Sequence, residues 1–155
     1  MSRAFVKDDD GGMGNEDLPD RLISEHANLV TPEGLAQIET EVARFNAAYA
    51  NAQSAADRVE LQRIARDLRY WTARRQSAVL VAPPGDAGRV QFGSTVTIER
   101  SDGRKHVYRM VGEDEANPNQ GTLSYVSPLA QALMGKTAGD VVMAGAGKVE
   151  ILDVS

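Results

Sequence analysis

Two series of apolar residues at heptad spacing, separated by a short polar stretch, dominate the segment 31–78. Steps of three and four residues place such side chains in one stripe along a helix, a pattern typical of coiled coils. Two stripes of similar length around a break at 53–58 predict an antiparallel helical hairpin. The first series is Leu35, Ile38, Val42, Phe45, Tyr49 and Ala52, and the second is Leu61, Ile64, Leu68 and Trp71.

Both ends of this hairpin carry recognisable signals. Thr31 is a good N-cap residue and Pro32 suits the first helical position, while the run Pro83-Pro84-Gly85 ends the helical pattern. Each arm would have about 22 residues and a length of roughly 33 Å. Neither stripe is wide enough for a globular core. We therefore expect the arms to bury their stripes against each other and to project from a separate domain.

Beyond Gly85 the apolar period changes from the helical repeat to two, which is typical of strands. Ser127-Pro128 precedes a short helical stretch, and Gly135 ends it. The sequence thus predicts an α+β protein, with an N-terminal coiled-coil hairpin and a C-terminal antiparallel sheet that carries one short helix. Strands are expected at 90–92, 95–100, 105–111, 122–126, 141–143 and 149–154, and the helix at 129–134.

The first thirty residues carry three basic and seven acidic groups, and the run DDDGGMGNED offers almost nothing to bury. Such a segment cannot offset the entropy of ordering, so we expect a flexible tail and linker. The expected domains are residues 1–30 as tail and linker, 31–80 as the hairpin and 81–155 as the sheet domain.

Composition excludes several kinds of site. The chain has no cysteine and two histidines, which leaves few ligands for a transition metal and removes cysteine nucleophiles. Its net charge of −5 argues against a protein that mainly coats nucleic acid. Since it lacks an apolar run of membrane-spanning length and the apolar stretch of a signal peptide, we expect a cytoplasmic protein without membrane contact. Nothing indicates self-association, so a monomer is expected.

Two carboxylates at the break between the arms are candidate metal ligands. Asp57 and Glu60 are three residues apart and share a helix face, where together they could hold a Mg²⁺ whose other ligands come from another molecule. From spacing alone, the stretch Ser54-Ala55-Ala56-Asp57 favours a capping box, in which Asp57 at the third position only satisfies a helix N-terminus, while Glu60 could pair with Arg63 or be solvated.

The second arm is rich in arginine, which suits bidentate contact with phosphates; the same side chains could also form an ordinary solvated helix face. The candidates for contact with RNA or phosphate are Arg58, Arg63 and Arg66. No catalytic constellation stands out elsewhere, because neither His26 nor His106 has an obvious nucleophile partner.

Four stretches, in this order, resemble the GreA/GreB transcript cleavage factors of bacterial RNA polymerase. They are Thr31-Pro32-Glu33-Gly34-Leu35, Phe92-Gly93-Ser94-Thr95-Val96, Val111-Gly112-Glu113-Asp114-Glu115-Ala116, and the run from Ser127-Pro128 to Gly135-Lys136. The resemblance implies an FKBP-like C-terminal domain that docks at the rim of the polymerase secondary channel. It also implies a coiled coil that enters the channel and places its acidic tip near the active centre.

By the same resemblance, Asp57 and Glu60 would help hold a Mg²⁺ shared with the polymerase, which would then hydrolyse the 3′ end of backtracked RNA. The chain would bind no cofactor and would be no enzyme by itself. The residues that match the family's docking loop and helix start are Glu113, Asp114, Glu115, Ser127 and Pro128.

Two departures from the family bear on the mechanism. Asp57-Arg58-Val59-Glu60 keeps the acidic pair of the family's tip motif but lacks its asparagine and its aromatic residue. The arms are also a couple of turns shorter, and each lost turn withdraws the tip by about 5.4 Å. A non-cleaving competitor for the secondary channel is therefore an alternative to a cleavage factor. An FKBP-like folding factor and a coiled-coil adaptor are further alternatives.

Overall fold

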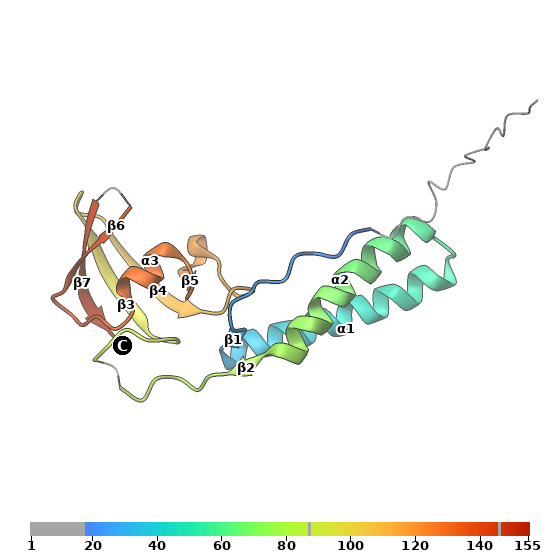
Figure 1. The fold of residues 1–155 in the computed structure, drawn as a ribbon, viewed down its shortest axis with the longest axis horizontal. Helices are drawn as coiled ribbons and strands as arrows, with labels where there is room; N and C mark the ends of the chain where they lie inside the picture. Colours follow the sequence, from blue (N-terminus) through green and yellow to red (C-terminus); the bar gives the residue numbers. More distant parts are fainter. Residues whose placement is uncertain (1–17, 87, 146) are drawn as a thin grey trace, which may run out of the picture.

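The computed structural model describes residues 18–86, 88–145 and 147–155 of the chain. A helical hairpin projects from a small domain built on a five-stranded sheet, and the first described residues run alongside the hairpin (Figure 1). The α+β fold expected from the sequence is confirmed.

The hairpin consists of α1 (Pro32–Ser54) and α2 (Arg58–Ser77), close to the expected bounds. The Thr31 hydroxyl caps α1 by accepting from the Gly34 N–H at 3.0 Å, and Pro32 occupies the first helical position. Members of both heptad series are buried between the helices, among them Ile38 and Ile64. Four of the ten series residues are buried in all, and the other six are half-buried, so the hairpin covers its apolar stripe only in part.

The chain segments before α1 and after α2 meet at the base of the hairpin. β1 (Leu29–Val30) pairs in parallel with β2 (Val79–Leu80), a contact that the sequence did not indicate.

We call residues 18–28, which precede β1, the strap. Asp20 of the strap pairs with Arg69 at 2.6 Å and Arg21 with Asp67 at 3.2 Å, while the Arg21 guanidinium lies 3.8 Å from the centre of the Tyr70 ring. The strap is therefore fastened along α2. The flexible tail expected for residues 1–17 lies outside the described residues.

The sheet has the strand order β5-β4-β3-β7-β6. Alternate side chains of its strands pack against α3 and form the core, which includes Ile98, Met110, Leu133 and Ile151. The elements of this domain are β3 (Thr95–Arg100), β4 (Lys105–Val111), a 3₁₀ turn η2 (Pro118–Gln120), β5 (Thr122–Ser124), α3 (Pro128–Leu133), β6 (Val141–Ala144) and β7 (Gly147–Val154).

Two expectations for the sheet need correction. β5 joins β4 in parallel, so the sheet is mixed rather than wholly antiparallel. The strand expected at 90–92 does not form, because Val90 forms backbone hydrogen bonds with the turn after α3, at Gly135 and Lys136, instead of with a strand. Its side chain is buried nonetheless, which explains why its apolar pattern resembled a strand.

Within the described residues, no helix combines the length and the apolar character needed to cross a membrane.

Candidate functional site

The hairpin tip is a tight turn at Ala55, Ala56 and Asp57. Asp57 is the N-cap of α2, and its Oδ1 accepts from the Glu60 N–H at 3.1 Å. The capping box expected at Ser54-Ala55-Ala56-Asp57 does not form, because Ser54 ends α1, and Asp57 instead caps α2 as the N-cap itself. Glu60 lies on the first turn and pairs with Arg63 at 3.3 Å, with its side chain 42% exposed.

The two tip carboxylates can therefore supply only part of a metal site. Among the described residues there is no group of three or more His, Asp or Glu side chains placed to hold a metal ion. Mg²⁺ is typically held by one or two carboxylates together with waters and phosphates. Asp57 and Glu60 fit that pattern as two ligands, provided that a second molecule brings the rest.

Ala56 makes the tip turn strained, because its φ of 54° lies in the left-handed region that favours glycine. We predict that Ala56→Gly stabilises the protein by about 1 kcal/mol, since a non-glycine residue in this conformation costs roughly 1–2 kcal/mol. Denaturant unfolding followed by helical circular dichroism measures the change. A destabilised Ala56→Gly protein would contradict the turn geometry.

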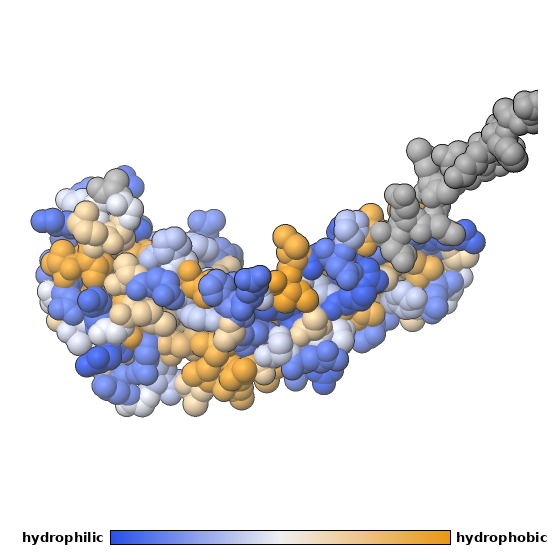
Figure 2. Space-filling model, in the orientation of Figure 1, coloured by the Kyte–Doolittle hydropathy of each residue, from blue (hydrophilic) through white to orange (hydrophobic). Residues whose placement is uncertain are grey.

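The arginines proposed for phosphate contact lie along one side of α2 but differ in exposure. Arg58 and Arg63 are exposed, while Arg66 is half-buried with its Nε enclosed and without a hydrogen-bond partner among the described residues. At 100° per residue, Arg63 and Arg66 lie about 140° and about 80° around the helix axis from Arg58, so the three side chains share one side of α2. Figure 2 shows hydrophilic surface over much of the distal hairpin in this view.

The acidic loop that matches the family's docking loop lies where the hairpin meets the sheet domain. Asp114 accepts from Arg74 Nε at 2.6 Å and from the Tyr70 hydroxyl, both on α2. Glu113 lies 3.7 Å from the same guanidinium. The Arg74 side chain is 2% exposed and that of Asp114 is 9% exposed, so this ion pair is shielded from solvent.

The strap completes this contact, which we call the joint. Asn28 accepts from Arg74 Nη2 and donates to the Arg74 carbonyl, both at 2.7 Å. Because Arg74 donates hydrogen bonds to both Asn28 and Asp114, it connects α2 with the strap and with the acidic loop. The sequence analysis missed Arg74, Tyr70 and Asn28 as joint residues. The only sequence signal was the acidic loop itself, which needs a basic partner if it is buried.

A second set of contacts fixes the start of α1 to the same loop. Glu115 accepts hydrogen bonds from the Thr31 hydroxyl, from the Thr31 N–H at 3.2 Å and from the Gly112 N–H at 3.1 Å. Tyr125 of the sheet domain donates to the Ala27 carbonyl of the strap. The whole loop from Glu113 to Glu115 is thus engaged inside the molecule.

Electrostatics keep the Tyr70 hydroxyl in its donor form. Burial, together with the hydrogen bond to Asp114, raises the pKa of Tyr70 to about 12. Burial, with Glu113 nearby, also raises the pKa of Tyr125. Both phenols therefore stay protonated at neutral pH and can serve as donors in the joint.

Ser127 and Pro128 form the start of α3 on the sheet domain. The Ser127 hydroxyl accepts from the Ala130 N–H at 3.3 Å, and Pro128 stands exposed at the first helical position. Neither residue has a hydrogen bond to Arg74 or Asp114 within the described residues. Of the five residues proposed for docking, Pro128 has the most accessible side chain.

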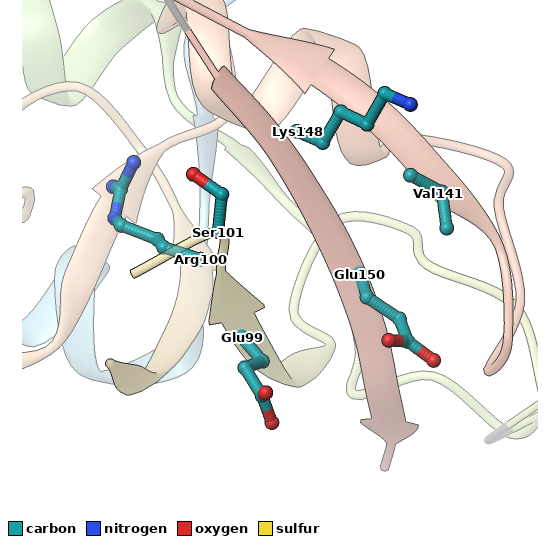
Figure 3. A pocket seen from close by; sticks show the side chains of 6 residues that line it. All are labelled: Glu99, Arg100, Ser101, Val141, Lys148 and Glu150. Atoms are coloured by element: carbon teal, nitrogen blue, oxygen red, sulfur yellow. The ribbon is translucent and has the colours of Figure 1, made fainter. Parts of the chain in front are cut away.

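A separate hollow of about 310 Å³ lies on the outer face of the sheet, over β3, β7 and β6 (Figure 3). Glu99 of β3 and Glu150 of β7 are direct neighbours there, across the two paired strands. The sequence analysis proposed none of its residues. Its lining is Glu99, Arg100, Ser101, Val141, Lys148 and Glu150.

Comparison with known proteins identifies the family. The sequence model described as "Transcription elongation factor, GreA/GreB, C-term" matches residues 85–155. The transcription elongation factor GreB of Pseudomonas aeruginosa is 34% identical over 127 residues, which cover 70% of this chain and 76% of that protein. The chain belongs to the GreA/GreB family.

A second curated relative matches over a smaller share of its length, and one solved structure matches over nearly all of its chain. GreB of Neisseria meningitidis is 37% identical over 100 residues, or 61% of each chain. The solved structure of GreA factor homolog 1 (Gfh1) from Thermus thermophilus is 16% identical, with a TM-score of 0.41 over 84% of this chain and 99% of that one. That structural similarity is too low to support an argument about function.

Proposed function

We propose that this chain is a transcription elongation factor that binds bacterial RNA polymerase and inserts its hairpin into the secondary channel. The supporting observation is the position of Asp57 and Glu60 at the start of α2, at the far end of a projecting hairpin in a GreA/GreB family member. A projecting hairpin can place its end accurately only if its base is held firmly, and the joint provides that support.

In this proposal the tip completes a site that the polymerase supplies. A Mg²⁺ shared with the polymerase would polarise the RNA phosphate and lower the pKa of a bound water. Asp57 and Glu60 would each contribute a carboxylate oxygen. Arg58, Arg63 and Arg66 would contact phosphates near the 3′ end of backtracked RNA. The chain by itself would hydrolyse nothing.

One observation favours a second candidate, a competitor that occupies the channel without stimulating cleavage. Both tip carboxylates already have partners inside the chain, since Asp57 caps α2 and Glu60 pairs with Arg63. A tip whose carboxylates serve only these contacts would block the channel without delivering metal.

Substitution of Asp57 distinguishes capping from metal binding. Asp57→Ser keeps an N-cap oxygen but removes the carboxylate, whereas Asp57→Ala removes both and costs about 1 kcal/mol of stability. If the tip binds metal, we expect Asp57→Ser to unfold like the wild type yet to cleave RNA in stalled, backtracked complexes roughly tenfold more slowly, the scale of disturbing a metal site.

The same assay decides between the candidates. If the wild-type chain shortens no RNA but slows the cleavage stimulated by an active Gre factor, the competitor is supported. If Asp57→Ser cleaves at the wild-type rate, the carboxylate has no role in metal binding. A chain that neither cleaves nor competes would contradict both candidates.

Pro128 offers the cleanest test of the docking surface. Pro128→Glu places a charge on the exposed start of α3, where an acidic residue suits the helix N-terminus and leaves the fold intact. We expect affinity for polymerase to fall about tenfold, as for loss of an interface residue worth about 1.4 kcal/mol. Titration with labelled protein measures it, and unchanged affinity would remove Pro128 from the interface. Asp114→Arg is a poorer test because it would also break the joint.

A further inference from the structure

One flank of α2 carries an apolar groove that no described part of the chain covers. The groove has a volume of about 310 Å³. Its lining combines Leu68, two alanines and a threonine with two longer polar side chains, all on α2. We call it the flank groove, and its lining is Ala65, Leu68, Arg69, Thr72, Ala73 and Gln76.

The strap begins beside this groove. Leu18, the first described residue, lines an adjoining hollow of about 160 Å³ together with Tyr49 and Leu61. The hollow and the groove share Ala65 and Arg69, so they lie next to each other on α2. The pair between Asp20 and Arg69 anchors the strap at this point. The seventeen residues before Leu18 are therefore tethered at the end of the flank groove.

That N-terminal segment contains one apolar run, Ala4-Phe5-Val6. The eleven residues 7–17 separate this run from Leu18, and twelve peptide steps can span up to about 40 Å. The flank groove extends over α2 residues 65–76, roughly 17 Å at 1.5 Å per residue. The tether is thus long enough to reach every part of the groove.

We propose that Ala4-Phe5-Val6 docks in the flank groove and adds a third apolar element to the hairpin. A buried phenylalanine covers about 150–250 Å² of surface. A short linker holds the run at an effective concentration of the order of 1 mM near the groove, so a weak contact is enough for docking. The acidic residues of 7–17 would then form a closed loop beside the distal part of α2. This inference is independent of the proposed function.

Engineered disulfides test the docking, because the natural chain has no cysteine. The pair Ala4→Cys/Ala73→Cys joins the run to the flank groove. The pair Ala4→Cys/Ala50→Cys joins it to an exposed residue next to Tyr49, closer to the tether. A third variant adds Phe5→Ser and Val6→Ser to the first pair, which keeps the tether but removes the apolar side chains.

If the run docks, the disulfide to residue 73 forms within one chain roughly tenfold faster than in the serine variant, and faster than the disulfide to residue 50. A freely moving segment would favour residue 50 and would be unaffected by the serines; either result overturns the proposal. Disulfides between chains would assign the groove to a second copy and would also overturn it.

A spin label gives the same answer without a second cysteine, should the Ala73→Cys chain fold poorly. A label on Ala4→Cys should broaden the amide signals of residues 65–76, and Phe5→Ser/Val6→Ser should remove that broadening. Equal broadening with and without the serine changes would contradict docking.

Discussion

Replacing Arg74 with methionine should lower the free energy of unfolding by about 3 kcal/mol, the scale of breaking a buried ion pair from one side. The Arg74 side chain is 2% exposed, and its loss would leave Asp114 shielded from water without its cation. Asn28 would lose its partner in the strap as well. We therefore expect both a lower thermal midpoint and a looser attachment of the hairpin to the sheet domain.

Denaturant unfolding measures the first effect, and small-angle X-ray scattering measures the second. Arg75→Met is the matched control, because Arg75 is the next residue along α2 and is exposed. It should change stability by no more than about 0.5 kcal/mol. In Arg74→Met/Asp114→Leu both charges are gone, so this double variant should recover part of the loss. If Arg74→Met and Arg75→Met behave alike, the joint contributes no stability.

Gly112→Ala should separate the sheet domain from the hairpin base and cost about 3 kcal/mol, the upper range for forcing extra atoms into a packed site. A Cβ at this position would lie 2.4 Å from the Leu29 carbonyl oxygen. Because that oxygen belongs to the backbone of β1, a side-chain rotation cannot relieve the clash. The chain must move, and the bond from the Gly112 N–H to Glu115 moves with it.

Gly85→Ala is the control for Gly112→Ala, since a Cβ there would meet nothing within 4 Å. We expect Gly85→Ala to unfold within about 0.5 kcal/mol of the wild type. Thermal unfolding compares the two variants, and exchange of the Thr31 amide hydrogen reports on the joint directly. Gly112→Ala with native stability and unchanged exchange would show that the close approach of β1 to this loop is not required.

Elements with local signals were predictable from the sequence. The heptad spacing of residues such as Ile38 and Ile64 indicated both helices of the hairpin, and Thr31 and Ser127 marked where α1 and α3 begin. These signals act within a few residues, through side-chain periodicity and capping hydrogen bonds. Period-two patterning likewise located β3, β4 and β7.

The joint was not predictable in this way, because its partners are distant in sequence. Arg74 and Asp114 are 40 residues apart, and Arg74 and Asn28 are 46 apart. On its helix Arg74 resembles any other surface arginine, and only the approach of the acidic loop makes it a buried cation. The role of Glu113, Asp114 and Glu115 in polymerase docking stays a prediction, to which the structure adds an intramolecular role for the same side chains.

The pairing of β1 with β2 allows the length of the helical hairpin to change without a change at its base. Leu29 lies opposite Val79 and Val30 opposite Leu80, so the two ends of the hairpin are fastened together independently of its tip. Matched insertions of whole heptads in the two arms would keep the apolar stripes facing each other. They would also leave the pairing of β1 with β2 unchanged. The two arms of the hairpin can thus be lengthened or shortened together, while the strand pairing at the base of the hairpin stays the same.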